Sequence, residues 1–265
     1  MNTPKACLAF VAASLLATAA PIAASAAPVK NIVLVHGAWA DASGWKGVYD
    51  ILSKKGFHVA MVQEPETSLA DDVAATRRVI DQQDGPTILV GHSYGGSIVT
   101  EAGVDPKVVG LVYVAAHAPN VGEDESALGA KTPSVLAKLS GAIVKSPDGF
   151  THLAPELFVK HFAPDLPHAQ AVFMSHSQVY AQASVFATPL TAAAWTTKPS
   201  WGVIAGGDQI INPDLERWYY TRAKSHITEI KGASHAVYAS HPAEVAAVIV
   251  EAALHAENST ASAER

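Results

Sequence analysis

The chain has 265 residues, of which 49% are hydrophobic and 16% are charged, and this fits one α/β domain with room for an inserted subdomain. The formal net charge of −6 and the lack of a basic patch argue against a nucleic-acid partner. The 12 histidines are scattered, and there is neither an H-E-x-x-H motif nor a Cys/His cluster, so the sequence predicts no metal and no cofactor.

The first 26 residues have the composition of a secretory signal peptide. Lys5 supplies a positive charge, residues 6–20 are apolar, and Ala24-Ser25-Ala26 is typical of a cleavage site. A transmembrane anchor is the alternative, but the apolar run is shorter than the ~20 residues that a span needs. We therefore expect a signal peptide over 1–26, a mature domain over 27–265, a periplasmic or secreted location, and no membrane attachment after cleavage.

The mature chain alternates apolar runs with amphipathic segments. The short apolar runs are typical of strands in a parallel sheet, which are buried on both faces, and the amphipathic segments are typical of helices. The predicted strands span 31–36, 57–63, 87–90, 108–115, 201–205 and 226–230, and the predicted helices span 45–55, 68–83, 97–101, 213–223 and 242–255. This alternation predicts an α/β fold with a six-stranded, mainly parallel sheet flanked by helices.

Residues 120–196 interrupt the alternation. They contain several prolines and no strand-like run, while 156–162 and 169–183 have helical composition. So long a stretch without a strand exceeds a simple crossover, and we expect a helical cap at about 120–196 inserted into the α/β core. A series of ordinary surface helices is the alternative.

Residues 91–95 read Gly-His-Ser-Tyr-Gly between a predicted strand and a predicted helix. The pattern G-x-S-x-G in this context is typical of a sharp turn that exposes a nucleophilic serine. The glycines leave room for the turn, and amides at the helix start stabilise negative charge. Ser93 is therefore the candidate nucleophile, and a glycine-rich loop without chemistry is the alternative.

Two further candidate catalytic residues follow predicted strands. They lie at the edge where a doubly wound sheet gathers its functional groups. Asp208 comes after the fifth strand and two glycines, and His235 comes after the sixth. The order Ser93, Asp208, His235 predicts a catalytic triad in which the histidine is the base and the aspartate orients it. Asp208 could instead be a turn residue. Asp214 is a weaker rival for the acid, because it falls inside the following predicted helix, and His241 is a weaker rival for the base, because it precedes Pro242 and suits a helix start.

The first strand ends in His36-Gly37-Ala38. The backbone N–H groups of Ala38 and Tyr94 are expected to form an oxyanion hole, with Gly37 allowing close approach to the substrate. Trp39 is either a wall of the substrate pocket or part of the core.

Three other histidines lie near these motifs. His117 follows the fourth strand and either lines the pocket or is a satisfied polar residue. His36 is expected to be structural. His92 is expected to point away from Ser93 and to support the site from behind.

Together these motifs resemble the α/β-hydrolase superfamily over residues 31–253. His36-Gly37-Ala38 with Trp45 downstream is similar to the small plant-type esterase and hydroxynitrile lyase branch, which includes methyl salicylate esterases. The resemblance implies a six-stranded core and a helical cap between the strands that carry His117 and Asp208.

Two positions depart from the hydroxynitrile lyases of that branch, which carry a lysine after the catalytic histidine and a threonine after the first-strand histidine. Here these positions are Ala236 and Gly37, which disfavours a lyase and favours ester hydrolysis. We expect an exported serine hydrolase that cleaves a small carboxylic ester or lactone through an acyl-enzyme, with that small molecule as its partner. A cofactor-free haloperoxidase-like or lyase activity, and a small-molecule binding protein, stay open as alternatives.

Overall fold

A six-stranded parallel sheet forms the centre of the protein, in a computed structural model that describes residues 29–263. The strands are β1 (Asn31–Val35), β2 (His58–Met61), β3 (Thr87–His92), β4 (Val108–Val114), β8 (Ser200–Ala205) and β9 (His226–Ile230). Their order is β2-β1-β3-β4-β8-β9, and every neighbouring pair is parallel. The predicted six-stranded α/β sheet is confirmed.

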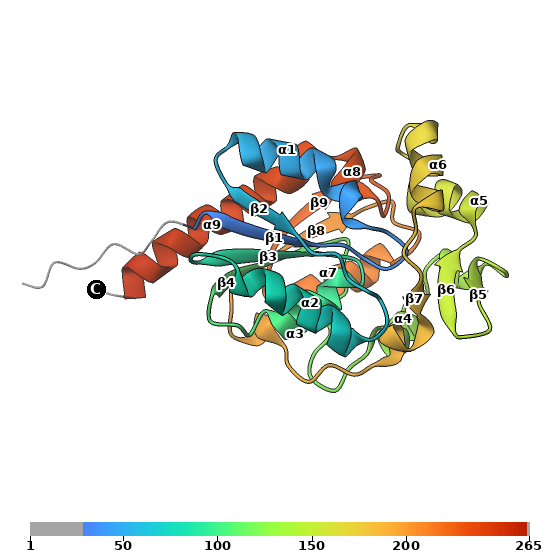
Figure 1. Ribbon diagram of the computed structural model, residues 1–265, viewed down its shortest axis with the longest axis horizontal. Helices are drawn as coiled ribbons and strands as arrows, with labels where there is room; N and C mark the ends of the chain where they lie inside the picture. The colour runs from blue at the N-terminus through green and yellow to red at the C-terminus, as the bar shows by residue number, and fades with distance from the viewer. Residues whose placement is uncertain (1–28, 264–265) are drawn as a thin grey trace, which may run out of the picture.

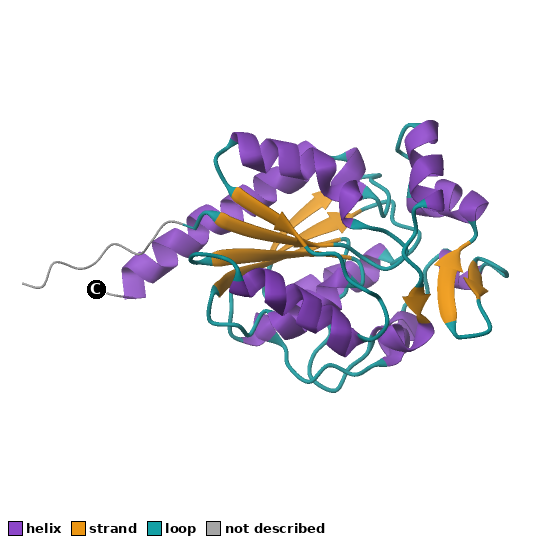
Figure 2. Ribbon diagram, viewed as in Figure 1, coloured by secondary structure: helices purple, strands orange, loops and turns teal. Residues whose placement is uncertain are grey.

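Helices cover both faces of this sheet (Figures 1 and 2). One face carries α1 (Lys46–Lys54), α8 (Val237–Ser240) and α9 (Pro242–Ala263), and the other carries α2 (Leu69–Asp81), α3 (Gly95–Ala102) and α7 (Pro213–Arg222). The Ser68 side chain caps α2 by accepting the Asp71 N–H at 3.1 Å, which explains where this helix begins. Helix α9 continues past the predicted end at residue 255.

The inserted segment, called the cap below (residues 120–196), contains strands that the sequence pattern did not predict. Strands β5 (Ile143–Lys145), β6 (Phe150–Leu153) and β7 (Ala181–Gln182) form an antiparallel sheet of three strands. The expectation of a strand-free segment was therefore wrong. These strands have only two to four residues, and β5 is exposed along its length, so they leave no apolar run in the sequence.

Short helices make up the rest of the regular structure in the cap. They are α4 (Glu125–Lys131), α5 (Pro155–Leu157), a π-helix (Phe158–Phe162) and α6 (His168–His176), with 3-10 helices at Leu136–Lys138, Ala183–Ala187 and Ala194–Thr196. The helix predicted over 169–183 ends at His176, because Ala181 and Gln182 pair with Thr151 and Phe150 of β6 instead. The cap lies at one end of the sheet (Figure 1).

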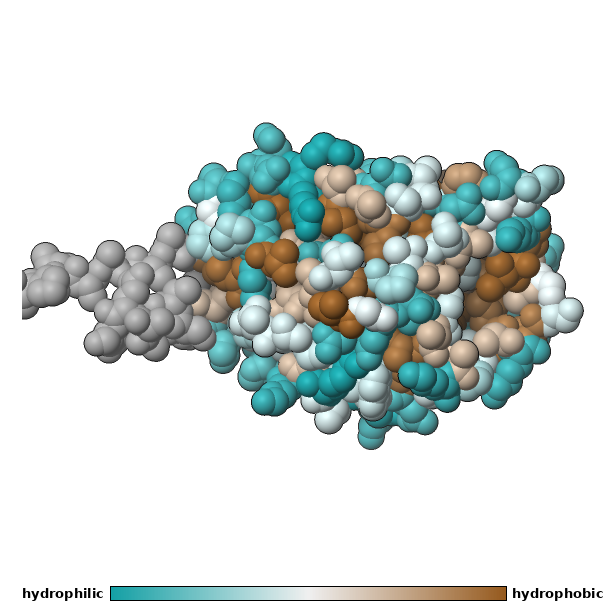
Figure 3. Space-filling view, turned by 90° about the horizontal axis from the view of Figure 1, so that it is seen from below, coloured by the Kyte–Doolittle hydropathy of each residue, from teal (hydrophilic) through white to brown (hydrophobic). Residues whose placement is uncertain are grey.

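The surface at the cap end carries several exposed hydrophobic side chains, which Figure 3 shows as a brown group at that end of the molecule. Within the cap they are Val121, Val135, Ile143, Val144, Phe173 and Tyr180. None of the helices in residues 29–263 is both long enough and apolar enough to cross a membrane. The predicted signal peptide, residues 1–26, lies outside the described residues.

Candidate active site

Ser93 occupies a strained turn between β3 and α3. Its φ is 53°, in the left-handed region that residues other than glycine seldom adopt. The turn is possible because Gly91 lacks a side chain, since a Cβ there would lie 2.5 Å from the carbonyl oxygen of Gly95. Gly91 thus permits the sharp turn from strand to helix that exposes the serine hydroxyl.

Ser93, His235 and Asp208 form a continuous hydrogen-bonded chain. Ser93 Oγ lies 2.9 Å from His235 Nε2, and His235 Nδ1 lies 2.6 Å from Asp208 Oδ2. The second carboxyl oxygen of Asp208 accepts the N–H groups of Ile210 and Ile211 at 2.7 and 3.0 Å. Because a carboxylate only accepts hydrogen bonds, Nδ1 carries a proton and Nε2 is free to accept the serine hydroxyl.

The two rival residues lie elsewhere. Asp214 is exposed in the first turn of α7 and pairs with Arg217 at 2.6 Å. His241 Nδ1 lies 2.9 Å from Ser240 Oγ. Among the described residues, neither side chain makes a hydrogen bond to Ser93 or His235, so the geometry favours Asp208 as the acid.

The loop that carries His235 is held from two sides. Asp165, in the cap, accepts the Ser234 N–H at 2.9 Å and the Ser234 hydroxyl at 2.5 Å. From the core, His92 Nε2 donates to the His235 carbonyl oxygen at 2.9 Å. Burial, with the neighbouring His235 adding to it, holds the pKa of His92 well below its usual range, so this histidine is a neutral donor.

The loop after β1 lies directly against the serine. A Cβ on Gly37 would lie 2.5 Å from Ser93 Cβ, so only glycine permits this approach. The next residue, Ala38, and Tyr94 both line a cavity in front of Ser93. Neither of their N–H groups donates to another described residue. Two unpaired donors beside a serine hydroxyl can stabilise a developing oxyanion.

A buried ion pair lies beneath this loop. His36 Nε2 contacts a carboxyl oxygen of Glu64, and His36 Nδ1 lies 3.6 Å from Glu66 Oε1. Burial opposes the charge on His36, but the attraction and hydrogen bond of Glu64, with Glu66 behind it, raise the pKa of the imidazole to about 9. His36 is thus held between two buried carboxyl groups, and it does not line the cavity.

The same cluster links the two candidate oxyanion-hole residues, Ala38 and Tyr94. Glu66 Oε2 accepts the Trp39 N–H at 3.4 Å, and the Glu66 N–H donates to Asp72 Oδ1 at 2.8 Å. Asp72 Oδ2 accepts the Tyr94 hydroxyl at 2.7 Å. The loop after β1 and the turn after β3 thus share one buried network of carboxyl groups, which fixes Ala38 relative to Tyr94.

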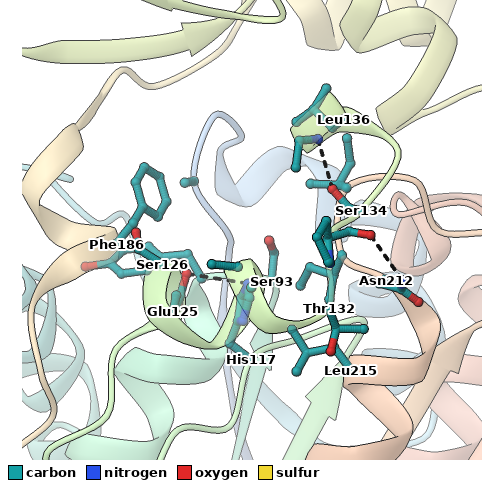
Figure 4. Close-up of a pocket in the computed structure, with 18 of the residues that line it drawn as sticks. Ser93, His117, Glu125, Ser126, Thr132, Ser134, Leu136, Phe186, Asn212 and Leu215 are labelled. Atoms are coloured by element: carbon teal, nitrogen blue, oxygen red, sulfur yellow. Dashed lines mark hydrogen bonds and ion pairs between the residues drawn. The ribbon is translucent and has the colours of Figure 1, made fainter. Parts of the chain in front are cut away.

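The cavity in front of Ser93 has a volume of about 490 Å³ and a mostly apolar wall. Trp39 and His117 both line it, although Trp39 also belongs to the buried core and His117 Nδ1 lies 3.2 Å from the Tyr219 hydroxyl. Trp39 Nε1 donates to Thr151 Oγ1 of the cap at 3.1 Å, and its ring packs on Phe186 with centroids 5.3 Å apart. Figure 4 shows Ser93 near the middle of the pocket, with cap residues on both sides.

Sequence reasoning missed one ionisable residue of the pocket, Glu125 at the start of α4. Its Oε1 accepts the Ser97 hydroxyl at 2.5 Å, and its Oε2 lies 3.6 Å from His117 Nε2. Nothing in the local sequence marks it, because Asp124-Glu125 reads as an ordinary polar helix start. Over residues 29–263, no group of three or more His, Cys, Asp or Glu side chains is arranged to hold a metal ion.

Known proteins with similar sequences and structures share this architecture. A sequence profile of the alpha/beta hydrolase family matches residues 32–248. Esterase PIR7B of Oryza sativa subsp. japonica is 27% identical over 272 residues, which cover 86% of this chain and 97% of the rice protein. A carbendazim hydrolyzing esterase of Nocardioides sp. (strain SG-4G) is 32% identical over 127 residues, which cover 42% of this chain and 52%, about half, of that relative.

Solved structures show the same fold. Polyneuridine aldehyde esterase superposes with a TM-score of 0.72 at 17% identity, over 84% of this chain and 98% of that protein. A pyrethroid hydrolase from Sphingobium faniae JZ-2 superposes with a TM-score of 0.70 at 21% identity, over 85% of this chain and 97% of that protein. At these identities the likeness concerns the fold alone.

Proposed function

Because the chain belongs to the α/β hydrolase family, we propose that it is a serine esterase that cleaves a small carboxylic ester or lactone through an acyl-enzyme on Ser93. The observation that carries this proposal is the hydrogen-bonded chain from Ser93 through His235 to Asp208. It ends beside a pocket with two unpaired N–H groups. Its relatives that are named esterases, in rice and in Nocardioides, support the same reaction class.

The geometry permits each step of acyl transfer. Ser93 Oγ attacks the ester carbonyl carbon while His235 Nε2 takes the hydroxyl proton. The carbonyl oxygen becomes negative and accepts the N–H groups of Ala38 and Tyr94. His235 then gives its proton to the departing alcohol, which leaves the acyl group on Ser93. Water, deprotonated by the same histidine, releases the acid, while Asp208 stabilises the charged imidazole in both halves.

The pocket indicates the size and polarity of the ester. Its volume of about 490 Å³ suits a small molecule rather than a polymer segment. Apolar side chains dominate its wall, among them Trp39, Leu136, Phe186 and Leu215. We therefore propose a largely apolar acid or alcohol part.

A fluorophosphonate probe tests the activated serine directly, because the probe reacts with serines that a base activates. We expect the protein spanning 27–265 to be labelled, and peptide mass analysis to place the label on Ser93. A panel of aryl and alkyl esters and lactones of graded chain length should be hydrolysed. Absence of both labelling and turnover would contradict an esterase and leave a binding protein on the same scaffold.

We also propose that the protein is exported, on the evidence of Lys5, the apolar run and Ala24-Ser25-Ala26. Protein recovered from the periplasm or medium should have an intact mass that begins at residue 27 or 28. Full-length protein confined to the cytoplasm would contradict export without affecting the proposed reaction.

A further inference from the structure

One carboxyl group of the cap enters the pocket beside the nucleophile. Glu125 is the first residue of α4, and the Asp124 side chain caps this helix by accepting the Ala127 N–H at 2.8 Å. This hydrogen bond fixes the start of α4 and therefore the position of Glu125, which is only 6% exposed and lines the cavity. Figure 4 shows Glu125 on one side of Ser93, with His117 next to it.

The two carboxyl oxygens of Glu125 have different surroundings. Oε1 accepts the Ser97 hydroxyl, whereas Oε2 makes no hydrogen bond to a described residue and lies 3.6 Å from His117 Nε2. The other imidazole nitrogen of His117 lies 3.2 Å from the Tyr219 hydroxyl. The described residues thus leave Glu125 Oε2 and His117 Nε2 with unused hydrogen-bonding capacity, both on the pocket wall.

This pair carries no net charge at neutral pH. Within the part of the chain that the structure describes, no lysine or arginine pairs with Glu125. Burial, with Asp124 adding to it, raises the pKa of the Glu125 carboxyl to about 8, although the Ser97 hydrogen bond opposes the shift. Burial, with His235 adding to it, lowers the pKa of His117 to about 3. A protonated carboxyl and a neutral imidazole can each donate and accept hydrogen bonds.

The contrast with the rest of the wall indicates a function. A buried polar group without a hydrogen-bond partner costs free energy. A ligand that supplies the missing hydrogen bond therefore binds more tightly than a ligand that does not. Trp39, Leu136 and Phe186 make the remainder of the pocket suited to apolar groups. A hydroxyl fits the polar part, because it donates and accepts at one atom as the Glu125–His117 pair does.

We propose that Glu125 and His117 form a polar subsite that binds a hydroxyl substituent of the ester, on the part of the substrate that lies beside Ser93. This inference rests on the proposed function and narrows it. The substrate class is a small, largely apolar hydroxy ester. Glu125 acts as a specificity residue and takes no proton from the reacting atoms.

Two matched pairs of esters test the subsite. Methyl butanoate and methyl 3-hydroxybutanoate differ by a hydroxyl in the acyl part, and butyl acetate and 3-hydroxybutyl acetate differ by one in the alcohol part. In at least one pair, the wild-type kcat/KM should favour the hydroxy ester by about tenfold, the size expected for one hydrogen bond to a buried polar group. Acid release in a pH-stat gives the ratio for each pair.

Variants at position 125 assign this preference to the carboxyl. Glu125→Gln keeps a donor and an acceptor and should keep the preference, whereas Glu125→Leu should bring the ratio to about one. Glu123→Leu is the matched control, because Glu123 lies two residues earlier, pairs with Arg222 at 2.9 Å and does not line the pocket. The Glu123 variant should keep the wild-type ratio.

The pH dependence of thermal unfolding tests the protonation of Glu125 without substrate. The titratable groups that face it are Asp124 on its own helix, His117 after β4, Tyr94 at the nucleophile turn and Tyr219 on α7. Because the folded-state pKa is raised, the contribution of Glu125 to stability is complete below its unfolded pKa and declines as pH rises through about 8. The Tm of Glu125→Gln should therefore rise relative to wild type between pH 5 and 9.

The outcomes separate the two proposals. Turnover with equal kcat/KM within both pairs, or a preference that survives Glu125→Leu, would contradict the subsite and leave the esterase intact. A difference in Tm that is constant with pH would contradict the uncharged state of the Glu125–His117 pair, since Glu125 would then have the same pKa in the folded and unfolded protein; the ester ratios decide the subsite itself. Absence of turnover for all four esters, together with absence of fluorophosphonate labelling, would overturn both.

Discussion

Replacing Ser93 by alanine will abolish ester turnover and leave the protein folded. The hydroxyl is small and makes one side-chain hydrogen bond, to His235 Nε2, so its loss removes little packing. The unusual φ of 53° belongs to the turn and is adopted by alanine at a similar energetic cost. The effect of the substitution therefore falls on the chemistry.

The size of the loss follows from the role of the hydroxyl. Without Ser93 Oγ no acyl-enzyme forms, and only the N–H groups of Ala38 and Tyr94 remain to act on a bound ester. Sites that lack a triad residue retain ~10³-fold acceleration over water from the oxyanion hole and binding. We therefore expect a kcat reduced by several orders of magnitude, but above that of the uncatalysed reaction.

Steady-state kinetics on one good ester and a thermal melt of the variant measure both parts of this prediction. Ser177→Ala is a suitable control, since Ser177 lies in the cap outside the pocket and its hydroxyl, among the described residues, donates only to the Met174 carbonyl oxygen. A Ser93→Ala protein with a kcat near that of wild type would show that the turn is structural and that the proposed mechanism is wrong.

Replacing Asp208 by asparagine will slow turnover by a factor of ~10⁴, the loss measured for the same change in a serine protease. The hydrogen bonds of Asp208 explain this loss of activity. Oδ1 of Asp208 accepts two backbone N–H groups, so the asparagine oxygen will keep that position and direct its NH₂ group at His235 Nδ1. The imidazole must then accept at Nδ1 and carry its proton on Nε2, where it cannot take the proton of Ser93.

Asp214→Asn is the matched control for this variant. Asp214 is exposed and pairs with Arg217 at the surface, so its neutralisation should change turnover by less than about tenfold, roughly 1.4 kcal/mol in barrier. Both variants should remain folded. A strongly impaired Asp214 variant beside an active Asp208 variant would show that the acid has been assigned to the wrong residue.

The sequence could not predict that the cap residue Asp165 binds the loop that carries His235. Asp165 contacts Ser234, 69 residues further along the chain, and the pairing depends on how the cap folds back over the sheet. Glu125 and Ser97 are 28 residues apart, in the cap and in the core, and meet for the same reason. The network of buried carboxyl groups that links Trp39, Glu66 and Tyr94 also joins loops that follow different strands.

The sequence by itself determined the central sheet and the chemistry expected at its edge. Strands buried on both faces need continuous apolar runs, and a serine at a strained turn needs glycines around it, so both leave local patterns. The ends of parallel strands meet at one edge, which brought Asp208 and His235 into the prediction before any distance was known. Only the tertiary structure showed that Asp208 lies within hydrogen-bond distance of His235, that His117 lies beside Glu125, and that the cap contains a small sheet. These features depend on contacts between segments far apart in the chain, and such contacts leave no periodic pattern in the sequence.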